Sequence, residues 1–294
     1  MKQLRKKTSL LLLMALCLPL IFPAFSAAEA GEETYPSALF LNVGKADSAI
    51  FFVGGKTYLV DAGTKKSAEA MLRALQTYQV TYLDGVMITH TDKDHVGGLP
   101  ALLQSGISVD RLYTPRFHTE KNDESHPVYE ASQKYGVPMT WSVAGDVISI
   151  DEENRFVVLG PLSHAPESDN DNSLVMDLQT PHGNMLLTGD MEFPQETEML
   201  QAGVIPAATV LKVSHHGEDD TSSKLFISTV RPQIAVISTS TEERKRTPSH
   251  KVLKLLWDVK ATVAVTQDVS CGILVTLRNG EAVAQQIDYL AEAM

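Results

Sequence analysis

Three strand-like segments of this chain run directly into residue types that bind metal ions. They are 84–89 (DGVMIT) before His90, 183–188 (GNMLLT) before Gly189 and Asp190, and 209–213 (TVLKV) before Ser214, His215 and His216. An Asp or His at the end of one strand is common, but three such ends in one chain are a much stronger signal. Functional residues concentrate on loops that a rigid scaffold positions, so we expect these strand ends to build a site.

The first of these strand ends is the densest in potential ligands. Four of them fall within six residues, namely His90, Asp92, Asp94 and His95. Alternation along a strand would send such side chains to opposite faces, but a tight loop lets them converge. Gly97 and Gly98 follow, and they allow the backbone to turn closely into the next helix. A polar capping loop would account for Asp94 alone, but not for two histidines and two aspartates together.

Short strands and helices interleave along the chain, which indicates an α/β protein. Segments rich in β-branched and aromatic residues predict strands at 38–43, 48–53, 57–60, 84–89, 155–160, 173–179, 184–188, 208–213, 233–238, 261–266 and 271–277. Helices are expected at 67–78, 98–104, 192–202 and 250–258. Residues 117–127 are predicted to be a polar loop in which His118 and His126 are solvated. We therefore predict one domain over residues 37–294, preceded by a short polar tail at 31–36.

The composition limits the possible functions. Of the 294 residues, 44% are hydrophobic and 21% are charged, which excludes a disordered chain and a multi-span membrane protein. Cys17 and Cys271 are the only cysteines, too few for a disulfide scaffold or a Cys-rich zinc module. The formal net charge of −11 argues against a protein that binds nucleic acid through bulk positive charge.

The first thirty residues have the pattern of a secretory signal peptide. Four basic residues precede an apolar run at 10–25, and Ser26-Ala27-Ala28 supplies small residues for cleavage. An uncleaved membrane anchor is the alternative, and Pro19 and Pro23 argue against it. Cleavage at residues 28–30 removes four basic residues and one acidic residue, which moves the net charge from −11 to −14. The mature protein is then expected to be secreted, with no membrane span.

The order of the motifs makes the chain recognisable. H-x-[HD]-x-D-H followed by GG, then TGD and then HHG, resembles the metallo-β-lactamase superfamily. With Asp92 in the second position, the chain more narrowly resembles the hydrolase domain of ComEC-type DNA-uptake competence proteins, which carry H-x-D-x-D-H-x-G-G. The likeness extends to the segments 41–47 (LNVGKAD), 59–63 (LVDAG) and 169–174 (DNDNSL), and it covers about residues 37–288.

The resemblance implies a fold and a set of ligands. The fold is a four-layer αββα sandwich with the metal site at one edge of its two sheets. His90 and Asp92 are expected to bind a first metal ion, and Asp94, His95 and His215 a second. Asp190 is expected to bridge the two ions. His216 is expected to support the ligands or to face the substrate, and catalysis is assigned to Asp94, Asp190, His216 and His250.

Two histidines need separate comment. His250 opens a helix in the segment 247–250 (TPSH), and relatives carry G-H-P near this place. Its ring is either a proton donor that faces the metal ions or a solvated residue at the start of a helix. The superfamily usually places a further histidine on the first metal, and here the candidate is His164 or none.

The expected ligands define a chemistry but not a substrate. Three carboxylates and three imidazoles suit Zn and Mn, with one to two ions per chain, and Asp92 favours the harder cation. Two such ions lower the pKa of a water molecule to about 7 and hold the attacking and leaving oxygens. This chemistry hydrolyses phosphodiesters, esters, lactones and lactams alike.

Three functions compete. The first is an exported phosphodiesterase or nuclease acting on a small-molecule or nucleic-acid phosphodiester, with Lys212, Lys224 and the basic turn 244–246 (RKR) as cations that hold phosphate. That turn is equally well explained as solvated surface. The second is an exported hydrolase of a lactone, a lactam or a cell-envelope phosphoester. The third, a non-catalytic metal-binding module, is disfavoured because the complete ligand set is retained.

The signal peptide yields a first prediction. We expect the mature N-terminus to lie between Glu29 and Gly31, because Ser26-Ala27-Ala28 and Ala28-Glu29-Ala30 offer the small residues that cleavage requires. N-terminal sequencing of the exported protein measures this directly, and exported material that still begins at Met1 would contradict it.

Overall fold

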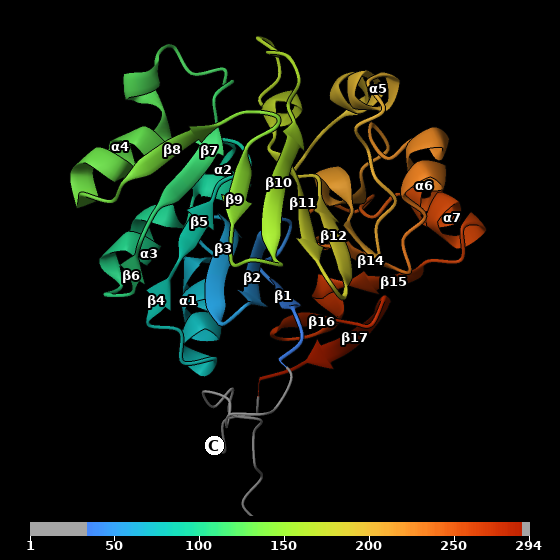
Figure 1. The fold of residues 1–294 in the computed structure, drawn as a ribbon, viewed down its shortest axis with the longest axis horizontal. Coiled ribbons are helices and arrows are strands. Elements are labelled where there is room, and N and C mark those ends of the chain that lie inside the picture. The colour runs from blue at the N-terminus through green and yellow to red at the C-terminus, as the bar shows by residue number, and fades with distance from the viewer. Residues whose placement is uncertain (1–33, 290–294) are drawn as a thin grey trace, which may run out of the picture. The chain divides into compact units, whose positions relative to one another are not determined.

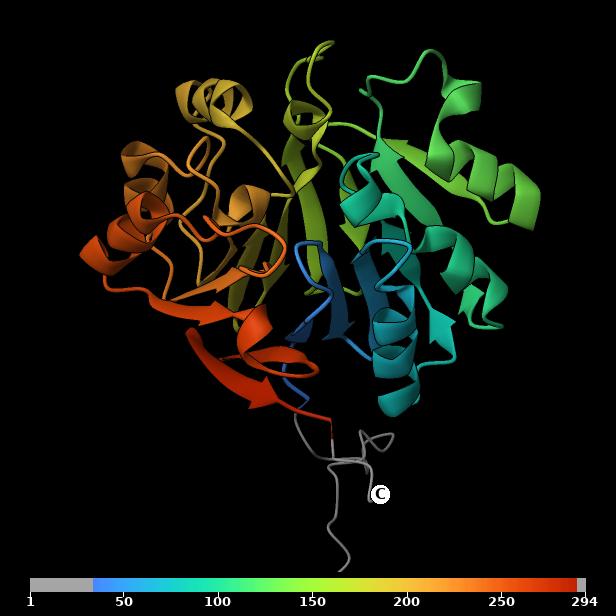
Figure 2. The same ribbon diagram turned by 180° about the vertical axis from the view of Figure 1, so that it is seen from behind.

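The computed structural model of the protein describes residues 34–289, which form two large β-sheets and their covering helices (Figures 1 and 2). The predicted signal peptide at residues 1–30 lies outside the described residues. Within residues 34–289, no helix is both long enough and apolar enough to cross a membrane. Residues 34–36 precede the first strand and belong to no helix or strand.

The first sheet has eight strands. Their order across the sheet is β17 (Glu281–Ile287), β16 (Gly272–Arg278), β1 (Ser37–Leu41), β2 (Ser48–Val53), β3 (Lys56–Ala62), β5 (Gly85–Met87), β7 (Leu112–Pro115) and β8 (Met139–Ser142). The strands from β3 to β8 run parallel to one another, and the others pair antiparallel. A separate two-stranded ribbon joins β4 (Tyr82–Leu83) to β6 (Ser108–Val109).

The second sheet has seven strands. Their order is β15 (Thr262–Val265), β14 (Ile234–Ile237), β13 (Val210–Lys212), β12 (Gly183–Leu187), β11 (Val175–Thr180), β10 (Arg155–Gly160) and β9 (Val147–Ser149). The strands from β12 to β15 are parallel. Each sheet therefore has a parallel half. The loops that follow the parallel strands all lie at the same edge of their sheet.

Helices cover the outer face of each sheet. The cover of the first sheet is α1 (Ala68–Thr77), α3 (Leu99–Gln104) and α4 (Pro127–Tyr135), and that of the second is α5 (Phe193–Gln201), α6 (Lys224–Val230) and α7 (His250–Asp258). Figure 1 shows these two groups on opposite flanks. The expected four-layer αββα sandwich is confirmed.

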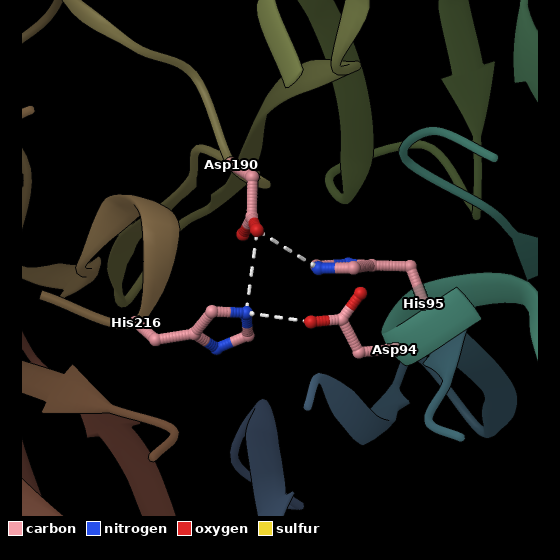
Figure 3. Close-up of side chains that lie close together, drawn as sticks. All are labelled: Asp94, His95, Asp190 and His216. Carbon is pink, nitrogen blue, oxygen red and sulfur yellow. Dashed lines mark ion pairs between the residues drawn. The ribbon is translucent and has the colours of Figure 1, made fainter. Parts of the chain in front are cut away.

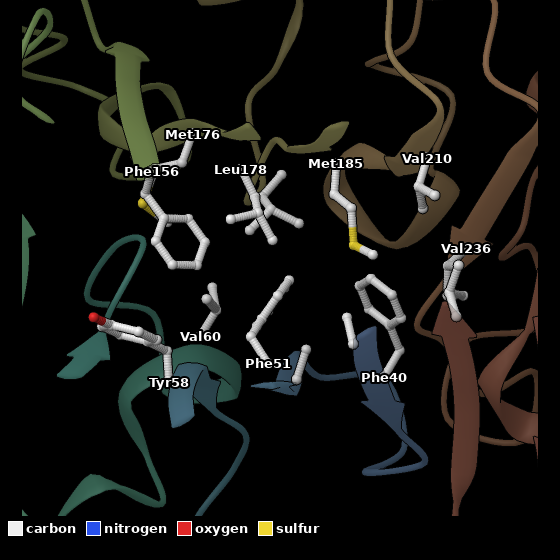
Figure 4. Close-up of a cluster of buried hydrophobic side chains, with 14 of the residues drawn as sticks. Phe40, Phe51, Tyr58, Val60, Phe156, Met176, Leu178, Met185, Val210 and Val236 are labelled. Carbon is white, nitrogen blue, oxygen red and sulfur yellow. The ribbon is translucent and has the colours of Figure 1, made fainter. Parts of the chain in front are cut away.

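The two sheets pack face to face through an apolar layer (Figure 4). Phe51 is buried there between Phe40 and Phe156, with ring centroids 6.1 and 5.8 Å away and the rings nearly perpendicular. Edge-to-face contacts of this kind stabilise a core beyond the area that they bury. On β1, Ala38 and Phe40 belong to this layer, while Leu39 and Leu41 pack beneath the helices. Burial on both faces explains why such strands are continuously apolar.

The polar loop expected at 117–127 is only partly present. α4 begins at Pro127, and the prediction that His118 and His126 are solvated is wrong. His126 is fully buried, and its Nδ1 accepts a hydrogen bond from the N–H of Val128 at the start of α4. Both rings pack on Trp141, at 5.5 and 4.8 Å between centroids. Burial lowers the pKa of His126 to about 4, so the ring is neutral at pH 7.

Removal of the Phe51 ring tests the packing between the sheets. We expect Phe51→Ala to lower the free energy of unfolding by about 3–5 kcal/mol, because the buried ring leaves a cavity. Leu225→Ala is the control: its side chain is 64% exposed, and the change should stay within about 0.5 kcal/mol. Urea denaturation measures both, and equal small effects would contradict the assigned core.

Candidate metal centre

Four ligand-type side chains from both halves of the sandwich meet at one edge of the sheets (Figure 3). Asp94 and His95 lie on the short helix α2 (Lys93–Val96), Asp190 follows β12, and His216 lies in the 3₁₀ turn η3 (Ser214–Gly217) after β13. The Oδ2 atom of Asp190 is 3.2 Å from Nε2 of His95 and 3.2 Å from Nε2 of His216. Oδ2 of Asp94 is 3.4 Å from Nε2 of His216. We refer to these four residues as the central cluster.

The turn between α2 and α3 needs its two glycines. A Cβ on Gly98 would lie 2.1 Å from the carbonyl oxygen of Ala62, and one on Gly97 would lie 2.3 Å from that of Lys93. Both are backbone contacts that no side-chain movement relieves. Gly97 therefore permits the close turn from α2 into α3 that the sequence predicts, and Gly98 permits the close approach of this turn to the end of β3.

Hydrogen bonds behind the rings orient two imidazoles. Nδ1 of His95 lies 2.9 Å from Oδ2 of Asp61, and Nδ1 of His216 lies 2.9 Å from the carbonyl oxygen of Ser238. Both acceptors require a proton on Nδ1, so Nε2 is the ring nitrogen that faces the cluster, and its lone pair becomes available to a metal ion when the ring is neutral. Metal-binding histidines are typically supported in this way.

His90 and Asp92 lie beside the central cluster. His90 is fully buried, and its Nε2 is 3.8 Å from Oδ2 of Asp92, whose side chain is 55% exposed. Nδ1 of His90 is 3.3 Å from the hydroxyl of Ser173, and the same hydroxyl accepts the backbone N–H of Asp190 at 3.1 Å. Ser173 thus connects the two halves of the site.

The buried donor and acceptor atoms of this site fit a metal ion. Within the described part of the chain, Nε2 of His90, His95 and His216 and Oδ1 of Asp190 are buried and make no hydrogen bond, although two of the rings are in ion-pair range of Asp190. Buried polar atoms are rarely left without a hydrogen bond in native proteins, so four at one place fit a site that binds a metal ion. Imidazole nitrogens together with carboxylate oxygens suit Zn or Mn.

The charges of the cluster are strongly coupled. Burial by itself would lower the pKa of His216, but the carboxylate of Asp190 raises it to about 9. The pKa of His95 is likewise raised well above its usual value, against burial, by Asp190 and Asp61. Burial raises the pKa of Asp190, but the charges of His216 and His95 hold it well below its ordinary value. Without metal, protons on the imidazoles therefore balance the carboxylates.

The two adjacent histidines occupy places opposite to those that the resemblance implied. His216 is in the central cluster, whereas Nε2 of His215 is 4.0 Å from Asp190, and its Nδ1 is 3.0 Å from Asp220. Glu192, His215 and Asp220 form a second group of possible ligands. Both histidines have left-handed backbone conformations, with φ of 44° and 53°. Such φ values are rare outside glycine, and a sequence gives no sign of them.

Two other expected site residues lie away from the central cluster. His250 is the first residue of α7, and its side chain is exposed. Its neighbour Ser249 donates its N–H to the carbonyl oxygen of Gly217, which brings this helix end next to η3. A catalytic role of His250 stays a prediction. His164 is exposed and stacks on Phe117, so the structure does not bring it to the cluster.

Some functional residues were not assigned a role from the sequence. Asp61 is the last residue but one of β3, two positions before Gly63, and it orients His95. Lys212 was expected to hold phosphate, but this is wrong. Its ammonium is buried 2.5 Å from Asp47 and also donates to the carbonyl oxygen of Val213. The only signal for this pair was a charged residue at the end of an apolar strand.

The fold and the cluster define an αββα protein with a candidate metal centre. The family model of the metallo-beta-lactamase superfamily matches residues 42–241, and the chain belongs to this superfamily. The chain is 36% identical over 178 residues to ComE operon protein 3 of Bacillus subtilis (strain 168). This match covers 60% of this chain and 22% of that protein. It is 26% identical over 230 residues to recombination protein 2 of Haemophilus influenzae, covering 77% and 27%. The chain thus spans about a quarter of the length of these relatives, and the expected ComEC-type resemblance is confirmed.

A solved structure agrees with the fold. The metallo-beta-lactamase fold protein YhfI from Bacillus subtilis superposes with a TM-score of 0.52 and 14% identity, covering 85% of this chain and 100% of that one. At this identity the likeness shows the fold alone.

Metal binding is expected to release protons. Because an imidazole must lose its proton to bind a metal ion, and the pKa of His216 is about 9, affinity should rise with pH up to that value, by up to about tenfold per pH unit. Titration calorimetry with Mn²⁺ at pH 6.5–8.5, in buffers of different ionisation enthalpy, measures the affinity for the metal ion and the number of protons released on binding.

Two variants test whether the released protons come from the central cluster. His216→Asn should bind Mn²⁺ more weakly and release fewer protons, whereas His164→Asn, at an exposed histidine, should match the parent protein. A binding enthalpy that is independent of the buffer would contradict the assigned protonation.

Proposed function

We propose that the protein is a metal-dependent hydrolase that cleaves phosphodiesters, with small-molecule or nucleic-acid phosphodiesters as substrates. The observation that carries this proposal is the convergence of unpartnered Nε2 atoms on the carboxylate of Asp190, with His90 and Asp92 beside it. Membership of the superfamily and the likeness to a competence-operon protein and a recombination protein support the same class of reaction.

The residues divide into two groups of ligands. We assign His90 and Asp92 to one ion and Asp94, His95 and His216 to the other; Asp190 would serve as a ligand shared by the two groups. When bound, two divalent ions supply Lewis acidity and lower the pKa of a water molecule towards about 7. Asp61 and the carbonyl of Ser238 keep two of the rings in position, so the ligand geometry exists before metal or substrate arrives.

Asp92 bears on both metal and substrate. Where a lactamase of this superfamily normally has a neutral imidazole, this chain has a carboxylate that is 55% exposed. An oxygen ligand with a negative charge shifts the preference towards a harder cation, so we propose that Mn serves at least as well as Zn. This also makes lactam hydrolysis the less favoured use of the centre.

A panel of substrates tests the proposal. The protein lacking residues 1–30 is loaded with Mn²⁺ or Zn²⁺ and offered bis(p-nitrophenyl) phosphate, single- and double-stranded DNA, a lactone and a cephalosporin. We expect metal-dependent phosphodiester cleavage, and Asp190→Asn should lower kcat by about a hundredfold or more because both ions lose a ligand.

The control is Asp258→Asn, which changes an exposed carboxylate paired with Lys254 on α7 and should leave kcat unchanged. Faster turnover of the lactone or the cephalosporin than of every phosphodiester would refute the proposal. So would full activity after the metal has been removed with a chelator.

A further inference from the structure

A lysine lies at the edge of the central cluster. Lys45 is in the loop between β1 and β2, and its ammonium is 3.6 Å from Oδ2 of Asp94 and 3.5 Å from Oε1 of Glu218. Its side chain is 18% exposed, so it is largely enclosed but still reaches solvent. Its backbone N–H donates to Glu243 at 3.2 Å, which fixes the loop next to the turn at 241–246.

Lys45 is close to two carboxylates without a hydrogen bond to either. Its contacts with Asp94 and Glu218 exceed the 2.7–3.2 Å range of N–H···O hydrogen bonds. No hydrogen bond from its ammonium occurs among residues 34–289, although an ammonium carries three donors. The donors therefore remain available for another acceptor at the edge of the cluster.

Glu218 lies between Lys45 and a second cation. It follows His216 by two residues, its side chain is 10% exposed, and its Oε2 accepts a hydrogen bond from Nη2 of Arg244 at 2.8 Å. Lys45 thus lies between Asp94 and Glu218, and Arg244 neutralises Glu218 from the other side. One residue of the basic turn therefore lies beside the site. On a chain with a net charge of −11, these two cations are positive groups at the edge of the cluster that an anion can approach.

We propose that Lys45 binds a phosphoryl oxygen of the substrate and selects phosphodiesters over uncharged esters, with Glu218 and Arg244 holding it at the cluster. Lysine suits this role as a compact charge on a flexible stem that follows a phosphate without fixed bidentate geometry. The inference rests on the proposed function, because it names the group that recognises the substrate of that reaction.

The test compares Lys45→Met with Lys254→Met, which removes a lysine on α7 whose side chain is 73% exposed. Lys45→Arg keeps the charge and serves as the conservative variant. We expect Lys45→Met to raise KM for bis(p-nitrophenyl) phosphate at least about tenfold, with a smaller effect on kcat, since hydrogen bonds to charged groups are worth at least that factor. For Lys45→Met, KM for an uncharged p-nitrophenyl ester should stay close to that of the parent protein. For Lys45→Arg and Lys254→Met, KM for bis(p-nitrophenyl) phosphate should stay close to the parent value.

A binding measurement separates this inference from the proposed function. Calorimetric titration of inorganic phosphate into the Mn²⁺-loaded protein needs no turnover, and Lys45→Met should weaken phosphate binding at least about tenfold while Mn²⁺ affinity is kept. If no phosphodiester is cleaved but this difference is found, the proposed function fails and the anion site stands. Equal phosphate affinity in Lys45→Met and Lys254→Met would overturn the inference and leave Lys45 as a counter-charge for Asp94 and Glu218.

Discussion

The apolar packing between the two sheets sets the position of every group at the metal centre. Phe40 and Phe51 from the first sheet interlock with Phe156 and its neighbours from the second, and this layer is buried throughout. Because each sheet has a parallel half, the packing brings the ends of β5, β12 and β13 to one edge. Residues about a hundred positions apart, such as His95 and Asp190, thereby come within 3.2 Å.

Burying the charged groups of this site makes folding less favourable when no metal ion is bound. Several carboxylates and imidazoles are buried together, and burying charges is unfavourable unless they are paired. Protons on His95 and His216 offset the charges of Asp190 and Asp94, and Lys212 offsets Asp47 just behind the cluster. A bound divalent ion would take the place of these protons and would give the buried Nε2 atoms a ligand bond. Affinity for metal and stability of the fold are therefore linked.

Much of the fold could be predicted from the sequence. The strands at 48–53 and 155–160 were predicted with the bounds that the structure shows, because these segments are rich in β-branched and aromatic residues. The helix at 250–258 also has its predicted bounds, because its apolar residues recur at helical spacing. The polar helix α4 was missed because its surface pattern is weak. The buried state of His126 could not be predicted either, since it depends on Trp141, a residue from another element.

The candidate site was predictable in its residue types but not in all of its geometry. His90, Asp94, His95 and Asp190 follow from motifs at strand ends, and the structure brings the last three together. The exchange of His215 and His216 depends on two left-handed backbone conformations that local sequence does not specify. Supporting contacts such as Asp47 with Lys212, 165 residues apart, form only through the packing of the two sheets.

The central claim is that the metal lies between the imidazoles of His95 and His216 and the carboxylate of Asp190. A crystal structure of the protein soaked in Mn²⁺, with anomalous data collected at the manganese absorption edge, measures this directly. The account predicts an anomalous peak within coordination distance of these three residues and Asp94. A peak confined to the neighbouring group of Glu192, His215 and Asp220, or a central cluster that stays empty at saturating Mn²⁺, would contradict it.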